Sequence, residues 1–321
     1  MDFLREHHRK DINKDKKKRL ANSIQKSMSF DSKSILNRDD NSLRFNSLHL
    51  KSIFDLMTLT MFIEDNNSVS KSYISFAKSL FNLAFDIRTA EEKVNLSTLR
   101  HCEDRKVNVD RSTLHQRDLF NCLYLNLFTG DNEALKQLRS TDFSLHLNYI
   151  NSNMVDIDRL FIELLVSFAL NDVNDQDKVR LLDSVQPYLV PGAISQHSNQ
   201  YTENIYRFLV FPLYSYVLFG WGFERKSLDE LTSMALQAHY EYYSEVLPVD
   251  NCDTDQDLYL NHGEVATCVG ITGVLKAIYN HYGKRMSHDS PYLPSHFIYN
   301  NETFNIDPTH FSEKAIDLIS N

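Results

Sequence analysis

The residues best placed to hold a metal ion form an acidic run in the C-terminal third of the chain. Asp253, Asp255 and Asp257 alternate along it, and Glu264 stands at the twelfth position counted from Asp253. This spacing matches the ligand positions of a calcium-binding EF-hand loop, but the sixth position is Leu258, where the sharp turn needs glycine. We therefore predict an acidic interhelical loop without a metal or other cofactor, and no heat on titration with millimolar calcium in a calorimeter.

A second group that could do chemistry is His239, which has Tyr242 and Tyr243 within one helical turn. An imidazole beside phenols could serve acid–base catalysis, yet no carboxylate at nucleophile spacing accompanies it, which favours a hydrogen-bonded core cluster. The sequence also contains no G-x-S-x-G, H-E-x-x-H or glycine-rich phosphate-binding motif. We predict that the protein is not an enzyme; a small-molecule enzyme using His239 and the neighbouring tyrosines is the alternative.

The net charge of −9 is unevenly distributed. Residues 1–110 hold 20 Lys and Arg against 16 Asp and Glu, whereas residues 111–321 hold 14 against 27. An acidic surface repels nucleic-acid phosphates and attracts basic proteins. We therefore expect a protein partner and no nucleic-acid ligand.

Several features indicate a cytoplasmic protein. The chain begins with charged residues and no apolar signal region, and its four cysteines form no C-x-x-C pair, as expected for free thiols in a reducing compartment. The longest apolar stretch, 208–223, spans 16 residues, fewer than the roughly 20 of a membrane-spanning helix. We expect no membrane association.

The first 45 residues are rich in Lys, Arg, Asp, Asn and Ser and contain few large apolar side chains. Such a segment cannot bury enough apolar surface to offset the entropy lost on ordering. We predict a flexible basic arm over 1–45, a helical domain over 46–299 and a C-terminal tail with a short helix over 300–321. A subdivision of the helical domain near residue 150 is the alternative to a single unit.

The pattern of apolar residues predicts the fold class. Gly (8) and Pro (7) are scarce, apolar residues recur at steps of three and four, and no stretch alternates with the period of a strand. We predict an all-α fold, an irregular bundle of about nine or ten helices. Beyond an antiparallel pair that begins near residue 47, the predicted helices include 112–128, 131–140, 156–168, 175–186, 202–219, 227–246 and 265–282.

Local signals refine these helices. Ser112 and Asp156 are predicted N-caps, and Ser227 with Glu230 forms a capping box. The segment 202–219 is apolar nearly all round, which predicts a helix buried on most sides and kinked at Pro212. The helix 265–282 carries a stripe of small residues, which predicts close approach by a neighbouring backbone. These are Ala266, Gly270, Gly273 and Ala277.

The C-terminal half resembles the immunity protein 49 family of bacterial polymorphic toxin systems. The resemblance covers about residues 110–299 and rests on Phe208-Leu-Val-Phe-Pro212-Leu, on L-D-E-L-T-S-M-A-L-Q-A-H-Y-E-Y-Y over 228–243, and on the closing segment Asp289 to Ile298. Trp221 stands alone where such a protein has more tryptophans, and the segments before residue 45 and after residue 300 depart from the family pattern. Helical immunity proteins of DNase toxins delivered by type VI secretion are a related alternative. The resemblance implies a helical protein, with no catalytic residues, that binds one toxin domain and prevents its action.

We place the predicted toxin-binding site on the acidic segment between Glu245 and Glu264, which holds no Lys or Arg. Toxins that cut nucleic acid have basic active sites, and acids at this segment would mimic the substrate and speed association. The predicted partner-binding residues are Glu245, Asp250, Asp253, Asp255, Asp257 and Glu264. A helical regulatory scaffold without a toxin partner is a further alternative.

Overall fold

The computed structural model describes residues 36–37, 42–63, 67–87, 107–145, 153–247 and 263–305. This part of the chain is mainly helical, so the all-α prediction is confirmed. It contains nine α-helices of at least seven residues. They are α2 (Ser47–Ile63), α3 (Asn67–Ala84), α5 (Gln116–Thr129), α6 (Asn132–Ser140), α7 (Asn153–Leu170), α8 (Asp175–Val185), α10 (Phe211–Gly220), α11 (Leu228–Glu241) and α14 (Val269–Tyr282).

Shorter helical segments extend or connect these helices. Two of them are π-helical turns, which continue α9 into α10 and extend the end of α11. The short segments are α9 (Gln200–Ile205), α15 (Ser295–Tyr299), the π-turns η5 (Tyr206–Val210) and η6 (Tyr242–Val246), and the 3₁₀ turns η2 (Arg111–Thr113), η3 (Phe143–Leu145), η4 (Gln186–Tyr188) and η7 (Gly263–Ala266).

A small sheet adds to the predicted helices. Strand β2 (Ser42–Phe45) pairs antiparallel with β1 (Leu36–Asn37) and parallel with β3 (Val107–Val109). Strands of two to four residues are too short to show a readable alternation of apolar and polar side chains. Phe45, the last residue of the predicted arm, is 2% exposed and belongs to the core. Apart from residues 36–37 and 42–45, the predicted arm lies outside the described residues, as does the tail after residue 305.

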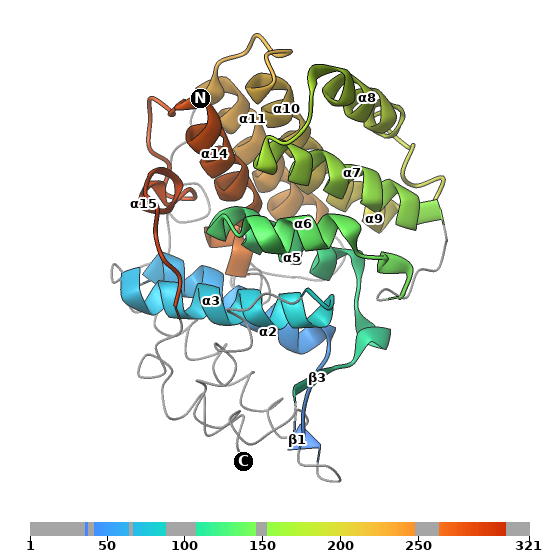
Figure 1. The fold of residues 1–321 in the computed structure, drawn as a ribbon, viewed down its shortest axis with the longest axis vertical. Helices are drawn as coiled ribbons and strands as arrows, with labels where there is room; N and C mark the ends of the chain where they lie inside the picture. The colour runs from blue at the N-terminus through green and yellow to red at the C-terminus, as the bar shows by residue number, and fades with distance from the viewer. Residues whose placement is uncertain are drawn as a thin grey trace.

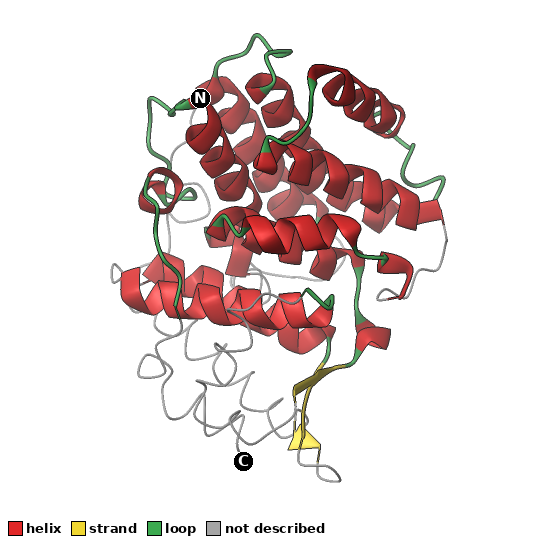
Figure 2. Cartoon of the chain, in the orientation of Figure 1, coloured by secondary structure: helices red, strands yellow, loops and turns green. Residues whose placement is uncertain are grey.

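The helices are arranged in layers (Figures 1 and 2). Figure 1 shows α2 and α3 side by side at one end of the described fold, α5 and α6 next to them, and the remaining long helices beyond. The main packing partners are α14 with α5, α2 with α3, α7 with α6 and α8, and α10 with α11. Their buried apolar side chains form one connected core that runs from Phe45 to Ile298.

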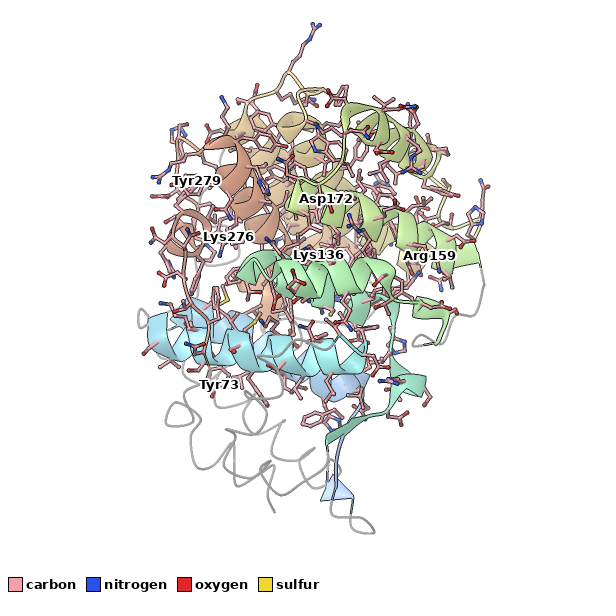
Figure 3. The ribbon with its side chains drawn as sticks, viewed as in Figure 1. Tyr73, Lys136, Arg159, Asp172, Lys276 and Tyr279 are labelled. Carbon is pink, nitrogen blue, oxygen red and sulfur yellow. The ribbon has the colours of Figure 1, made fainter. Side chains whose placement is uncertain are left out.

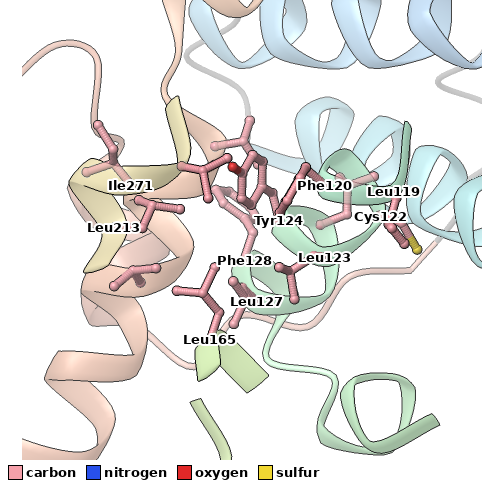
Figure 4. Packing of buried hydrophobic residues seen from close by; sticks show 14 of the residues in the cluster. Leu119, Phe120, Cys122, Leu123, Tyr124, Leu127, Phe128, Leu165, Leu213 and Ile271 are labelled. Carbon is pink, nitrogen blue, oxygen red and sulfur yellow. The ribbon is translucent and has the colours of Figure 1, made fainter. Parts of the chain in front are cut away.

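Helix α14 packs closely against α5 at two glycines. A Cβ atom added at Gly273 would lie 2.8 Å from the Cβ of Leu127 and 2.9 Å from the backbone nitrogen of Phe128. One added at Gly270 would lie 3.2 Å from the ring of Tyr124. The prediction of close backbone approach is confirmed, and Figure 4 shows the α5 side chains that surround this contact. Gly283 ends α14 with a φ of +62°.

Several predicted helix ends differ from the structure. Helix α7 begins at Asn153, so Asp156 lies in its first turn and is not the N-cap. Ser112 lies in a 3₁₀ turn, and α5 begins four residues later, where His115 and Asp118 form the capping box. In α14 the regular helix begins at Val269, because residues 263–266 form a separate 3₁₀ turn. The box of Ser227 and Glu230 is confirmed.

The apolar segment 202–219 is less buried than its composition predicts. In α10 the fully buried residues are Leu213, Tyr216 and Val217, whereas its other residues are partly exposed. Pro212 has no backbone N–H to donate, and it stands directly after the π-turn η5, where the hydrogen-bonding ladder already changes. The proline therefore coincides with a change of helical pitch.

A buried lysine connects α14 to the end of α5. Lys276 is 4% exposed, and its Nζ donates a hydrogen bond of 3.2 Å to the carbonyl oxygen of Phe128 (Figure 3). The ammonium also lies 5.4 Å from the centre of the Phe304 ring. Burial lowers the pKa of Lys276 from its ordinary value to about 8.

Substitution of Gly270 and Gly273 should distinguish a contact with the Tyr124 side chain from a contact with the backbone of α5. We expect Gly273→Ala to reduce the free energy of unfolding by about 1–3 kcal/mol, since the new methyl group meets the backbone of α5. Gly270→Ala should change it by less than about 1 kcal/mol, because the new methyl group requires only a small shift of the Tyr124 side chain and alanine favours the helix. Urea unfolding of both variants measures the difference, and equal losses would contradict this account of the contact.

The pKa of Lys276 predicts a specific dependence of stability on pH. Because the folded-state pKa is about 8 and the unfolded value about 10.5, the charged form is disfavoured by folding, and this cost is fully present below pH 8. As the pH rises from 8 to 10, the folded protein should gain roughly 2 kcal/mol of stability from this group. Urea unfolding at a series of pH values should show this gain as a difference between the wild type and Lys276→Met, and parallel curves would exclude it.

Candidate functional site

The six predicted partner-binding residues are divided by the structure. Asp250, Asp253, Asp255 and Asp257 lie outside the described residues, as does most of the loop with calcium-like spacing. Glu245 lies in η6 and is exposed. Glu264 lies in η7, where its carboxylate forms an ion pair with Arg117 of α5. Of the two described acids, Glu245 is therefore exposed to solvent, whereas the carboxylate of Glu264 is paired with the Arg117 cation.

Arg117 is the centre of a polar cluster between α5 and the end of α11. Its guanidinium donates a 2.8 Å hydrogen bond to the hydroxyl of Tyr243 and a longer one, 3.4 Å, to that of Tyr242. The ion pair with Glu264 is largely shielded, since the two side chains are 17% and 16% exposed. The guanidinium of Arg117 is thus largely shielded from solvent and interacts with three side chains, those of Tyr242, Tyr243 and Glu264.

The titration properties of the cluster follow from its burial. Burial raises the pKa of Tyr242 to about 12 and that of Tyr243 well above its ordinary value. Burial by itself lowers the pKa of Arg117, but the nearby groups, Tyr243 first among them, reverse the direction, so this pKa lies above its ordinary value. Near neutral pH the cluster therefore consists of an arginine cation, a paired carboxylate and two neutral phenols.

His239 joins this cluster from the inner face of α11. It is 5% exposed, and its Nε2 lies 3.2 Å from the backbone carbonyl oxygen of Glu264. Its ring is 4.7 Å from that of Tyr243 and 6.2 Å from that of Tyr292. The structure thus places His239 in a hydrogen-bonded aromatic environment, as the core interpretation predicts.

A small cleft opens beside these residues, with a volume of about 50 Å³. At roughly 10–15 Å³ for each water molecule, it has room for about three to five atoms of that size. Its walls come from segments that are distant in sequence. The lining residues are Phe54, Tyr124, Phe208, Leu209, Pro212, Ala235, His239, Tyr243, Glu264, Thr267, Cys268, Val269, Gly270 and Ile271.

Both π-turns contribute to this cleft. Phe208 and Leu209 belong to η5, and Tyr243 belongs to η6. Phe208 of the first turn also lies against Tyr242 of the second, with ring centres 6.3 Å apart. π-turns inside α-helices are rare and occur frequently at functional sites. Two of them at one cleft mark it as the main candidate for ligand binding in the described structure.

The outer face of α11 and η6 has a different character. We define the acidic face as Glu230, Met234, Gln237, Glu241 and Glu245, which follow one another at steps of three and four residues. Met234 is 50% exposed and places one apolar side chain within this face. Within the described part of the chain, neither Glu241 nor Glu245 forms an ion pair with Lys or Arg.

Among the described residues, no cluster of His, Cys, Asp and Glu could hold a metal ion, and no helix combines the length and apolarity needed to cross a bilayer. Comparison with protein-family models, curated proteins and solved structures finds no match. The resemblance to the immunity protein 49 family therefore stays a prediction, and the function has to be argued from the residues described above.

Sequence reasoning identified His239 and its neighbouring tyrosines but missed Arg117 of the polar cluster and Tyr124 of the cleft. Arg117 and Tyr124 lie seven residues apart in α5, which places them on the same face of that helix. The available signal was an arginine placed just before the largely apolar stretch 119–128. Its partners Glu264 and Tyr243 are more than 120 residues away in sequence, so no local pattern could pair them.

Removal of the carboxylate that faces Arg117 should be costly. We expect Glu264→Gln to lower the free energy of unfolding by about 2–4 kcal/mol, because it leaves a shielded cation without its ion-pair partner. The control Glu133→Gln removes an exposed partner of Lys136 and should cost less than about 0.5 kcal/mol. If the two variants unfold at the same urea concentration, the ion pair contributes nothing beyond an ordinary surface pair.

Proposed function

We propose that this protein is an immunity protein, which binds a cognate bacterial toxin domain with a basic surface and neutralises it by stoichiometric contact. A domain that cuts nucleic acid has such a surface. The supporting observation is a long segment that contains many acids and no lysine or arginine. Residues 227–275 contain nine Asp and Glu and no Lys or Arg, so this segment accounts for the whole net charge of −9.

The acidic face lies within the described part of this segment. Glu241 and Glu245 stand one helical turn apart on it, and both lie near the C-terminal end of the continuous helix formed by α11 and η6. Like charges at this spacing repel each other, and a helix C-terminus disfavours acids. The two residues are therefore unfavourable for the helix that carries them, and binding of a basic partner offers a compensating gain.

Exposed charge of one sign acts mainly on the rate of encounter. An uncompensated acidic patch attracts a basic protein over about one Debye length, roughly 8 Å at physiological ionic strength, and raises association rates by 10-fold or more. Met234 adds an apolar contact within the same face, since Met side chains adapt to the surface they meet. The predicted residues Asp250, Asp253, Asp255 and Asp257 extend the negative charge in sequence beyond Glu245.

The test of the function is growth rescue. Co-expression with the toxin encoded by the adjacent gene should restore growth, and a pull-down should recover the two proteins in a fixed ratio. Rescue without any complex, or no rescue by any neighbouring toxin gene, would contradict the proposal.

The test of the surface is charge reversal. Glu241→Lys with Glu245→Lys should slow association with the toxin domain about 10-fold at 50 mM NaCl and flatten the dependence of the rate on salt. The control, Asp156→Lys with Asp183→Lys, reverses two exposed acids outside the segment and should change the rate less than twofold. Reversal of Asp250, Asp253, Asp255 and Asp257 tests the rest of the segment in the same assay. Unchanged rates and salt dependence in both sets of variants would exclude the acidic segment as the toxin-binding surface.

A further inference from the structure

Tyr124 carries a buried polar group without a partner. The residue is 9% exposed, and its hydroxyl oxygen has no hydrogen-bond partner among the described residues. Figure 4 shows the hydroxyl pointing away from α5, toward the side on which Ile271 and Leu213 lie. Buried hydroxyls in proteins nearly always bind another protein group, a water molecule or a ligand. This hydroxyl belongs to a residue that lines the cleft.

The beginning of α14 faces the same cleft. Cys268 is the N-cap of this 14-residue helix and makes no side-chain hydrogen bond to the first turn. The backbone N–H groups of Val269, Gly270 and Ile271 have no acceptor inside the helix, and all three residues line the cleft. The start of a helix also carries partial positive charge. The Tyr124 ring lies directly against Gly270, so the phenol and the helix start adjoin one space.

We propose that this cleft binds the carboxylate of a small organic acid of two or three carbon atoms, held by the Tyr124 hydroxyl and the N-terminal amides of α14. The groups that meet there are hydrogen-bond donors, and a carboxylate is an acceptor with two oxygens. The apolar walls, among them Phe54, Phe208 and Ile271, suit a short hydrocarbon chain.

The charges around the cleft are consistent with an anion. Glu264 is the carboxylate that lines it, and its charge is neutralised by Arg117. The phenols of Tyr242 and Tyr243 stay neutral at physiological pH, because burial raises the pKa of each. The N-terminus of α14 therefore contributes a partial positive charge to the cleft, and no other group among the described residues there cancels this charge. The volume of about 50 Å³ limits the ligand to a few non-hydrogen atoms.

This site is independent of toxin binding. The acidic face lies on the outer side of α11, whereas Ala235 and His239 line the cleft from the inner side of the same helix. A failure of the toxin proposal therefore leaves the carboxylate proposal in place, and a failure of the carboxylate proposal leaves the toxin proposal in place.

The experiment is a titration of the full-length protein with sodium propionate, followed by the NMR signals of its backbone amides. Sodium chloride at equal concentration controls for ionic strength, and propionamide, which has the same shape without the charge, controls for the carboxylate. We expect saturable shifts of the Val269, Gly270 and Ile271 amides in the millimolar range or below, and binding of propionamide at least fivefold weaker.

The decisive variant is Tyr124→Phe, which removes the hydroxyl and keeps the ring. It should weaken propionate binding roughly tenfold, since a hydrogen bond to a charged acceptor is lost. Its melting temperature should not fall, because the hydroxyl has no partner in the protein. The matched control is Tyr216→Phe, which removes a buried hydroxyl bonded to Thr232 at 3.1 Å; it should melt at a lower temperature and bind propionate as the wild type does.

Four results would overturn the proposal. They are the absence of saturable shifts at 100 mM propionate, equal binding of propionamide, unchanged binding by Tyr124→Phe, and a clear loss of thermal stability in that variant. The last result would show that the hydroxyl has a structural role.

Discussion

The fold depends on the distance between α14 and α5. At Gly273 the missing Cβ allows the two backbones to approach until they touch, and any larger side chain would meet Phe128 or Leu127. This contact also determines where the ends of both helices lie. Lys276, one turn after Gly273, reaches the carbonyl oxygen of Phe128 because the helices are this close. The rings of Phe297 and Phe304 then cover Phe128 from the C-terminal side, at 5.2 and 5.9 Å.

The polar cluster follows from the same packing. Helix α5 brings Arg117 and Tyr124 to one side, and α14 brings its N-terminus and the preceding turn with Glu264 to meet them. The π-turn η6 has a separate effect. An extra residue in a helical turn rotates every later side chain by about 100° relative to a regular α-helix. Tyr242 and Tyr243 lie in this altered turn, where both hydroxyls reach the guanidinium.

The parts of the fold that depend on local chemistry could be predicted from the sequence. The capping box of Ser227 and Glu230 and the small-residue stripe of α14 each have a physical reason within a few residues. The errors have physical reasons as well. Asp156 is not the N-cap because α7 begins earlier, at Asn153. The apolar composition of 202–219 does not show which side of the helix is exposed to solvent.

The site was less predictable than the fold. His239 and its tyrosines stand within one turn and were visible, whereas the ion pair of Arg117 with Glu264 connects residues 147 positions apart. Such a pairing is determined by the tertiary contact of α5 with η7 and leaves no periodic signal. The unsatisfied hydroxyl of Tyr124 is equally invisible, because a buried tyrosine has the same sequence signature whether or not its hydroxyl has a partner.

The acidic residues of α11 and η6 differ in the hydrogen bonds that they form within the protein. Asp229 accepts hydrogen bonds from the backbone and hydroxyl of Ser287, and Glu230 accepts them from Ser227. Glu241 receives one bond from the Gln237 amide, and Glu245 is exposed. The first two acids thus have structural roles that account for their presence. Uncompensated charge increases toward the C-terminal end of the helix, where the helix dipole makes an acid least favourable. Local structure gives no reason for acids at that end, so the proposed contact with a basic partner is centred there.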